Sequence, residues 1–327
     1  MSTIAQYLIY LIIIIAVAWP VGRYISKIIK HEDTILSSLL NPIEQTIYRI
    51  FNIKINQEMH WKIYTKKIML ISAVEFAILF IVQTFQQVLV VDKFSHMEWG
   101  FAFHTATTFV SNINYEILDS AEALPMVTKV LGFIFQNSIS AAIGIGMIFA
   151  LVRAFTRTDT SKIGNCYADI IKIIVHILIP LNVVLALILV AGLQATTDKE
   201  FIIGFIEMTY ALLIPFALCF AFGENLKRER AIVIVIQLMR LVLVGISITF
   251  HTMLANYITA YGVVNTPPSA EIVHIILGVF VLGTRFLPMI GTLTLSGWIA
   301  SNDNAKLIVK KINEFISADK RCTIQEL

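Results

Sequence analysis

The chain has 327 residues, of which 57% are hydrophobic and only 14% are charged, and its mean hydropathy is +0.79. A soluble domain carries about a quarter charged residues, so this composition argues against a soluble enzyme and indicates an integral membrane protein. The net charge of +3 is too small to define a partner, and nucleic acid is not an expected one.

Seven segments are apolar enough to cross a hydrocarbon core, which takes about 20 residues of helix. In chain order they are about 4–22, 68–91, 127–151, 168–193, 201–222, 231–255 and 272–299. The first segment has no basic stretch before it and is followed by Lys and Arg, which indicates a retained span rather than a signal peptide. We therefore predict an all-α integral membrane protein with about seven transmembrane helices.

Lys and Arg residues are frequent in every second loop between these segments and rare in the others. Because cytosolic loops carry the excess of basic residues, the N-terminus is predicted outside and the C-terminus in the cytosol, with the chain crossing the membrane several times. Residues 1–327 are expected to form a single transmembrane domain. Its predicted parts are a first span at 1–22, a cytosolic loop at 23–67, a helix–pore loop–helix unit at 68–151, the remaining spans at 152–300 and a cytosolic tail at 301–327.

The cytosolic loop contains a predicted amphipathic helix. Ile43, Ile47 and Ile50 recur at helical spacing, Asn41 is suited to cap the helix, and Pro42 fits the first turn. An interfacial or partner-binding helix fits this pattern as well as a solvated helix lying on the protein.

The connection between the second and third segments includes a short apolar stretch at about 98–109, which is too short to cross a bilayer. It leads into small residues with hydroxyl and amide groups. A half-helix that stops midway would direct its negative C-terminal end at a cation, and the carbonyl groups after it would replace the hydration shell of that cation. The pattern fits such a pore loop and an ordinary outside loop with an interfacial helix equally well. His104, before the paired threonines, fits either a pore vestibule or simple packing.

Several charged residues lie in or next to the predicted spans, where charge is costly. Arg240 and Arg285 are expected either in a polar bundle interior or in a structural ion pair. Glu75 and Lys172 lie nearer helix ends, where an ion pair or extension to the membrane surface is favoured. Arg153, at a predicted cytosolic helix end, is expected to be structural or to face a partner.

Four stretches carry long and specific motifs. They are EMHW at 58–61 with Tyr64 after it, AFHTATTFVSNINYE at 102–116, the segment 136–157 that ends in RAFTR, and the segment 214–224 that ends in ALCFAFGE. In these stretches the chain resembles the KdpA family, the potassium-binding subunits of bacterial Kdp potassium-importing P-type ATPases.

The resemblance implies a fold similar to the superfamily of K⁺ transporters, with one re-entrant pore loop. It implies a bacterial plasma (inner) membrane as the location, K⁺ as the transported ion and no other cofactor. The implied partners are a Kdp-type ATPase subunit, accessory Kdp subunits and the lipid bilayer, with no catalytic site in this chain. The implied ion-binding residues of the pore loop are Thr107, Thr108, Ser111, Asn112, Ile113, Asn114 and Glu116. Of the two intramembrane charges, Arg285 matches an Arg in the last helix of the family, whereas Arg240 is identified by its position within a span.

The chain also departs from the family pattern. KdpA-type chains supply four pore loops each, and only the first is recognised here. Ile113 stands in place of the usual Thr, Tyr115 in place of Trp and Glu116 in place of Gln. The resemblance is therefore to a shortened, divergent member lacking most of the later pore loops. Two alternatives remain open: a truncated, non-conducting relative with an assembly or regulatory role or none, and a homotetrameric cation pore to which each chain supplies one loop.

Overall fold

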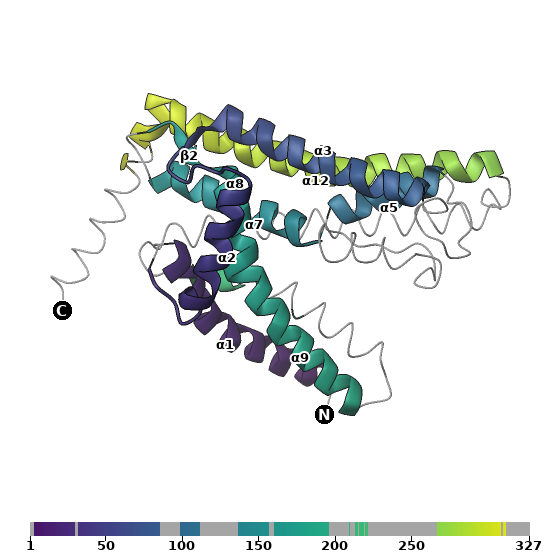
Figure 1. The fold of residues 1–327 in the computed structure, drawn as a ribbon, viewed down its shortest axis with the longest axis horizontal. Helices are drawn as coiled ribbons and strands as arrows, with labels where there is room; N and C mark the ends of the chain where they lie inside the picture. The colour runs from purple at the N-terminus through teal and green to yellow at the C-terminus, as the bar shows by residue number, and fades with distance from the viewer. Residues whose placement is uncertain are drawn as a thin grey trace. The chain divides into compact units, whose positions relative to one another are not determined.

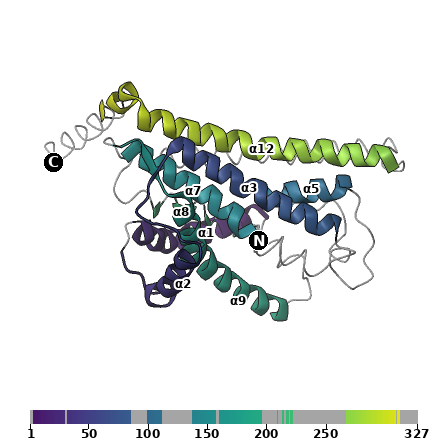
Figure 2. The ribbon, with the colours of Figure 1, turned by 45° about the horizontal axis from the view of Figure 1, so that its top comes forward.

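A computed structural model describes residues 3–29, 32–85, 99–111, 137–156, 160–195 and 267–308, with short stretches between 209 and 221 and residues 310 and 311. The chain divides into two compact units. The first unit is Met1–Asn52 with Ile171–Leu243, and the second unit is Ile53–Ile170 with Val244–Leu327. Within each unit the described residues are almost all helical (Figures 1 and 2).

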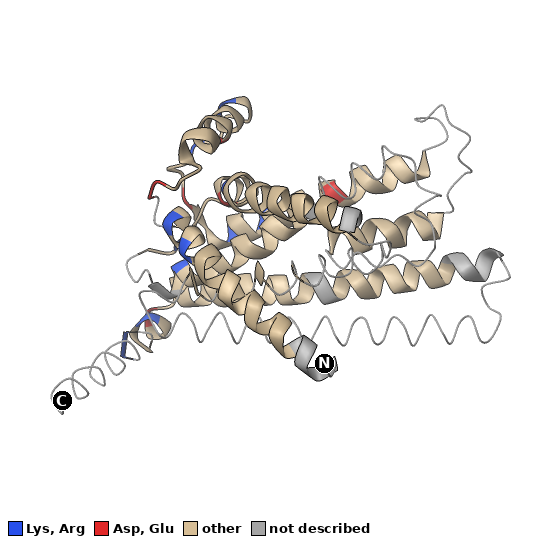
Figure 3. Cartoon of the chain, turned by 90° about the horizontal axis from the view of Figure 1, so that it is seen from below, with Lys and Arg blue, Asp and Glu red and all other residues tan. Residues whose placement is uncertain are grey.

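Four described helical stretches are long and apolar enough to cross a membrane: Leu8–Ile29, Trp61–Thr84, Cys166–Gly192 and Ile272–Ser301. A shorter apolar helix covers Ser138–Ala154. Figure 3 shows these helices free of charge along most of their length. The predicted all-α membrane class is thus confirmed. The count of seven spans stays a prediction, because the segments 201–222 and 231–255 lie largely or wholly outside the described residues.

Helix ends differ from the predicted span ends. Helix α1 (Thr3–Ile29) continues past residue 22, and α3 (Trp61–Thr84) begins before residue 68. The reason is that a helix continues beyond the hydrocarbon core for as long as its backbone bonds are satisfied, whereas hydropathy marks only the apolar part.

One continuous helical segment changes its winding midway. Helix α8 (Cys166–Ile173) leads into the π-helical turn η2 (Ile174–Leu178), which leads into α9 (Ile179–Ala195). Pro180 follows His176 by four residues and has no N–H to donate to the His176 carbonyl. The Tyr24 hydroxyl, from α1, donates to that carbonyl instead, over 2.9 Å. Pro180 thus does not occupy this carbonyl, and the hydrogen bond from Tyr24 joins α1 to η2.

Helix α2 (Ser37–Ile50) is the predicted amphipathic helix, but its start was wrongly predicted. Asn41 and Pro42 lie inside the helix, which begins after Leu36. Ser37 organises the entry, since its Oγ accepts a hydrogen bond of 2.7 Å from the backbone N–H of Thr34. Pro42 removes a single backbone hydrogen bond, and the leucines before it extend the apolar pattern far enough for the helix to start earlier.

The second unit is built around α3 and α12 (Pro267–Ser301), which run side by side in Figures 1 and 2. Helix α5 (Trp99–Val110) packs against both of them, and α7 (Asn137–Thr156) packs against α12 and α5. Strand β1 (Met59–His60) pairs antiparallel with β2 (Lys162–Gly164), with Met59 opposite Gly164. The short ladder joins the entry of α3 to the segment between α7 and α8.

Candidate ion-binding site

Helix α5 occupies the position of the predicted half-helix. Its 12 residues make a helix of about 18 Å, well short of a hydrocarbon core of about 30 Å. Thr107, Thr108 and Ser111 are buried at its C-terminal end. The other proposed ligands, Asn112, Ile113, Asn114 and Glu116, lie outside the described residues.

The hydroxyl groups at this end are engaged by backbone carbonyls. Thr107 Oγ1 donates to the His104 carbonyl over 2.6 Å, and Thr108 Oγ1 donates to the Thr105 carbonyl over 2.8 Å. Carbonyls in the last turn of a helix have no N–H donor within the helix, and they carry its negative partial charge. The negative partial charge makes the backbone oxygens of this turn candidates for contact with a cation, and the threonine hydroxyl oxygens keep lone pairs that could serve as well.

Helix α12 fixes the position of α5 through a close approach of small residues. A Cβ added at Gly278 would lie 2.7 Å from the Phe103 ring and 3.0 Å from Thr107 Oγ1. Further along, the Ser111 hydroxyl donates to the Val281 carbonyl over 3.5 Å. Such glycine contacts allow membrane helices to pack at short distance, and here the glycine lies directly against a candidate site residue.

Helix α3 covers another side of α5 with aromatic and aliphatic side chains. Leu79, Ala106 and Phe109 form a buried cluster, against which Phe76 and Phe80 pack. The Phe76 and Phe103 rings meet edge to face, with 5.4 Å between their centroids. Close packing of this kind resists rotation of α5, so the end of the helix is held from two sides.

Polar residues are also buried in the α3–α5–α12 assembly. His104 is fully buried, and its ring lies 5.8 Å from that of His274 on α12. Gln83, one turn beyond Leu79 on α3, is fully buried, and within the described part of the chain its amide has no hydrogen-bond partner. Glu75 is buried on the same helix. Of the proposed intramembrane charges, Arg240 and the side chain of Arg285 are outside the described residues.

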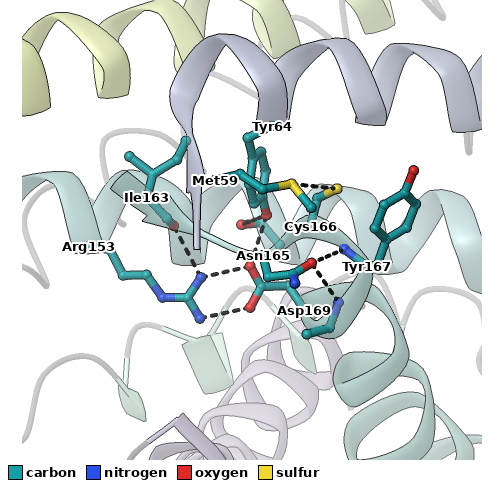
Figure 4. A network of polar contacts seen from close by, with 10 residues as sticks. Met59, Tyr64, Arg153, Ile163, Asn165, Cys166, Tyr167 and Asp169 are labelled. Atoms are coloured by element: carbon teal, nitrogen blue, oxygen red, sulfur yellow. Dashed lines mark hydrogen bonds and ion pairs between the residues drawn. The ribbon is translucent and has the colours of Figure 1, made fainter. Parts of the chain in front are cut away.

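At the other end of α3, the Asp169 carboxylate links residues of two of the motifs found in the sequence (Figure 4). The Arg153 guanidinium donates two hydrogen bonds of 2.7 Å to the Asp169 carboxylate. The Tyr64 hydroxyl donates to the same carboxylate over 3.1 Å. Arg153 belongs to RAFTR and Tyr64 follows EMHW, so this contact fits the structural one of the two roles predicted for Arg153.

The connection into α8 completes this cluster. Asn165 Oδ1 accepts from the backbone N–H of Tyr167 over 3.1 Å, which caps the helix. Gly164 has a φ of +118°, and a Cβ there would overlap the Arg153 guanidinium. The sequence analysis missed Asp169. A carboxylate at the start of an apolar span requires a partner, so its position in the sequence already indicated a buried ion pair.

A second buried ion pair lies in the first unit. His176 Nε2 and Glu44 Oε2 are 2.8 Å apart, and the Tyr48 hydroxyl donates to Glu44 Oε1 over 2.6 Å. Burial alone would raise the pKa of Glu44, but the hydrogen bonds from His176 and Tyr48 outweigh it and hold the pKa below its ordinary value. The pair fastens α2 to the π-helical turn.

Comparison with known proteins places these features in a family. Residues 8–203 match the family KdpA: Potassium-transporting ATPase A subunit. A potassium-transporting ATPase potassium-binding subunit of Clostridium botulinum is 30% identical over 308 residues, covering 75% of this chain and 53% of the relative. The corresponding protein of Clostridium perfringens is 31% identical, covering 70% of this chain and 50% of the relative.

A protein of the same name from Geobacter metallireducens is 34% identical over 57% of this chain and 32% of the relative. The chain therefore spans about half the length of the first two relatives and a smaller part of the third. The relatives are named as a binding subunit of an ATPase, in agreement with the prediction that this chain is not the catalytic one. From these matches and from the motifs gathered around α3 and α5, we conclude that the chain belongs to the KdpA family of potassium-transporting ATPase A subunits.

Proposed function

We propose that this chain binds K⁺ as the channel-like subunit of an ATP-driven potassium importer, taking the ion from the outside and passing it inward. The observation that carries the proposal is helix α5, which is short, buried and held by α3 and α12, and which ends at the hydroxyl and amide residues of a family motif. Phosphoryl chemistry would belong to a Kdp-type ATPase subunit, and accessory Kdp subunits would complete the assembly.

The residues have distinct roles in this proposal. Backbone oxygens from the end of α5 through Asn114 would replace the hydration shell of K⁺, and Glu116 would add charge at the outer mouth. The predicted orientation, with the N-terminus outside, sets the direction of entry.

A direct binding experiment tests the site. The purified chain in detergent would be titrated with K⁺, and with Na⁺ as a reference ion, while its thermal unfolding is followed. Gly278→Ala forces α12 away from Phe103 and Thr107, and we expect it to reduce K⁺ affinity more than tenfold. Gly283→Ala is the matched control on the same helix, because a Cβ there meets nothing within 4 Å. Equal K⁺ binding by both variants would contradict a site at the end of α5.

A second comparison separates carbonyl from hydroxyl coordination. Because the proposal assigns the ion to backbone oxygens, Thr108→Val, which removes only a side-chain hydroxyl, should change K⁺ affinity less than threefold. A loss as large as that of Gly278→Ala would assign the hydroxyl to the ion.

Growth at low potassium tests transport. The chain would be expressed in cells that lack their own uptake systems, with and without the other Kdp subunits. Rescue that needs those subunits and is lost on changing Ser111 and Asn112 is the expected result. Rescue by the chain alone would indicate a self-assembled pore, and no rescue by membrane-inserted protein would contradict transport.

A further inference from the structure

Helix α2 has three distinct faces, each following helical spacing. The face docked on the protein consists of Ser37, Leu40, Glu44 and Tyr48, all buried. A second face consists of the exposed polar residues Ser38, Asn41, Gln45 and Arg49. The third face is an apolar stripe of Leu36, Leu39, Ile43, Ile47 and Ile50, which we call the α2 stripe. A helix with a docked side, a polar side and an apolar side has the pattern of one lying in the plane of a membrane surface.

The α2 stripe is open in the structure. Leu39 is 65% exposed and Ile50 is 70% exposed, and Phe51, directly after the helix, is 69% exposed. Exposed apolar area of this extent is costly in water. Helices α1 and α9 also expose large apolar residues, and both belong to candidate membrane-crossing stretches. The α2 stripe therefore resembles their exposed surfaces.

The contacts of α2 connect it to two candidate spans, near the C-terminal end of Leu8–Ile29 and in the first half of Cys166–Gly192. Its docked face reaches η2 through the Glu44–His176 pair, and η2 reaches α1 through the hydrogen bond from Tyr24 to the His176 carbonyl. The two contacts therefore meet at His176 and join α1, α2 and η2 in the first unit.

The residues around these contacts carry the markers of a lipid headgroup region. On α1, the Arg23 guanidinium lies 4.9 Å from the centroid of the Trp19 ring, next to Tyr24 in sequence. Half-exposed Trp with a cation beside it is typical of a membrane interface. On α8, Lys172 lies one turn before His176 and precedes the apolar run of α9.

The charges beside the stripe favour an anionic surface. Arg23, Lys27 and Arg49 are exposed. The acidic residues of the α1–α2 segment are Glu32 and Asp33, which precede the helix, and Glu44, whose carboxylate is paired with His176. Basic residues near a membrane surface are attracted by anionic phospholipids.

From this juxtaposition we propose that α2 lies in the headgroup region of the bilayer. The α2 stripe inserts among the upper acyl chains, and Arg49 meets the phosphate groups of anionic phospholipids. The docked face keeps α2 attached to η2, so the helix holds lipid against the first unit. This inference concerns a lipid surface and is independent of ion binding at α5.

Accessibility of single labelled cysteines tests the proposal in the full chain. The chain would carry one spin label at Ile43→Cys or Leu39→Cys on the stripe, or at Gln45→Cys or Ser38→Cys on the polar face, with the native cysteines replaced by serine. Each protein would be placed in phosphatidylcholine nanodiscs, with and without phosphatidylglycerol. Because all four positions are on the helix surface, the pairs are matched for effects on folding.

We expect the ratio of oxygen to water-soluble nickel accessibility to be several times higher at the two stripe positions than at the two polar positions. Equal, water-like values on both faces would overturn the proposal in favour of a solvated helix. Stripe positions shielded from both reagents would overturn it in favour of a covering protein segment.

The preference of α2 for anionic lipid is tested with the variant Arg49→Gln. In nanodiscs with phosphatidylglycerol, we expect the label at Ile43→Cys to lie deeper than in phosphatidylcholine alone, and Arg49→Gln to remove this difference. Arg49 lies outside the Glu44–His176 pair, so the docking of α2 is retained. A depth that does not respond to phosphatidylglycerol would overturn the preference for anionic lipid.

Discussion

The two ends of α3 are held in the second unit by different means. Near its start, Tyr64 meets the Arg153–Asp169 ion pair, so charge and hydrogen bonds define the contact. Near its end, Leu79 packs on α5, which in turn lies against Gly278 of α12, so shape alone defines the contact. The first kind of contact fails when a charge is lost, whereas the second fails when volume is added.

The largest expected effect comes from breaking the charged end. Asp169→Asn leaves the Arg153 guanidinium largely buried without its counter-charge, and we expect a loss of about 3 kcal/mol in the free energy of unfolding. Thermal and denaturant unfolding in detergent would measure it. Asp303→Asn, at an exposed position of the same unit, is the control and should change stability by less than about 0.5 kcal/mol.

The double substitution Arg153→Met with Asp169→Leu sharpens the result. Removing both charges leaves no uncompensated ion, so most of the lost stability should return. If the double variant is as unstable as Asp169→Asn, the ion pair is not what the single variant lost.

The second prediction asks whether shape also matters at the charged end. A Cβ at Gly297 of α12 would overlap the Trp61 ring at the start of α3. We expect Gly297→Ala to cost about 2 kcal/mol, as overpacking does. Gly291→Ala, where a Cβ meets nothing within 4 Å, should be neutral or slightly stabilising because alanine favours helix. Identical melting of the two variants would contradict the close approach of α12 to α3.

A smaller effect is expected from Tyr64→Phe. The change removes one hydrogen bond to Asp169 and retains both bonds from Arg153, so we expect a loss of about 1.5 kcal/mol. Tyr167→Phe keeps a ring beside Lys67 and serves as the control. A loss as large as that of Asp169→Asn would mean that Tyr64, rather than Arg153, is the main partner of the carboxylate.

The smallest effect concerns the first unit and depends on pH. The pKa of Glu44 is lower in the folded chain than its ordinary value of 4.5. The folded state therefore binds fewer protons, and the stabilisation is present above pH 4.5 and lost as the pH falls through the folded value. Tyr48→Phe removes one donor to Glu44 and should cost about 1 kcal/mol at neutral pH, and less in acid. Melting curves across this range would measure it, and a cost independent of pH would contradict the assignment.

Some of these features could be predicted from the sequence, because the signal was local. Hydropathy identified the membrane class, and the change from apolar to small polar residues predicted the end of α5 within two residues of Val110. The periodicity of Ile43, Ile47 and Ile50 predicted an amphipathic helix. Each of these signals lies within one stretch of chain, where spacing alone carries the information.

Other features could not be predicted, because they depend on distant neighbours. The docked face of α2 requires His176, which is 132 positions from Glu44. Gly297 and Gly291 lie in one helix and look alike in the sequence, although only the first lies against Trp61. A capping role for Asn41 was favoured by residue type, but the start of α2 was decided by the residues before it.

The long separation of Glu44 from His176 also bears on how the protein is made. Synthesis proceeds from the N-terminus, so α1 and α2 leave the ribosome well before η2 exists. During that interval the Glu44 carboxylate has no imidazole to meet. The Glu44–His176 contact that docks α2 can therefore form only after η2 has been made.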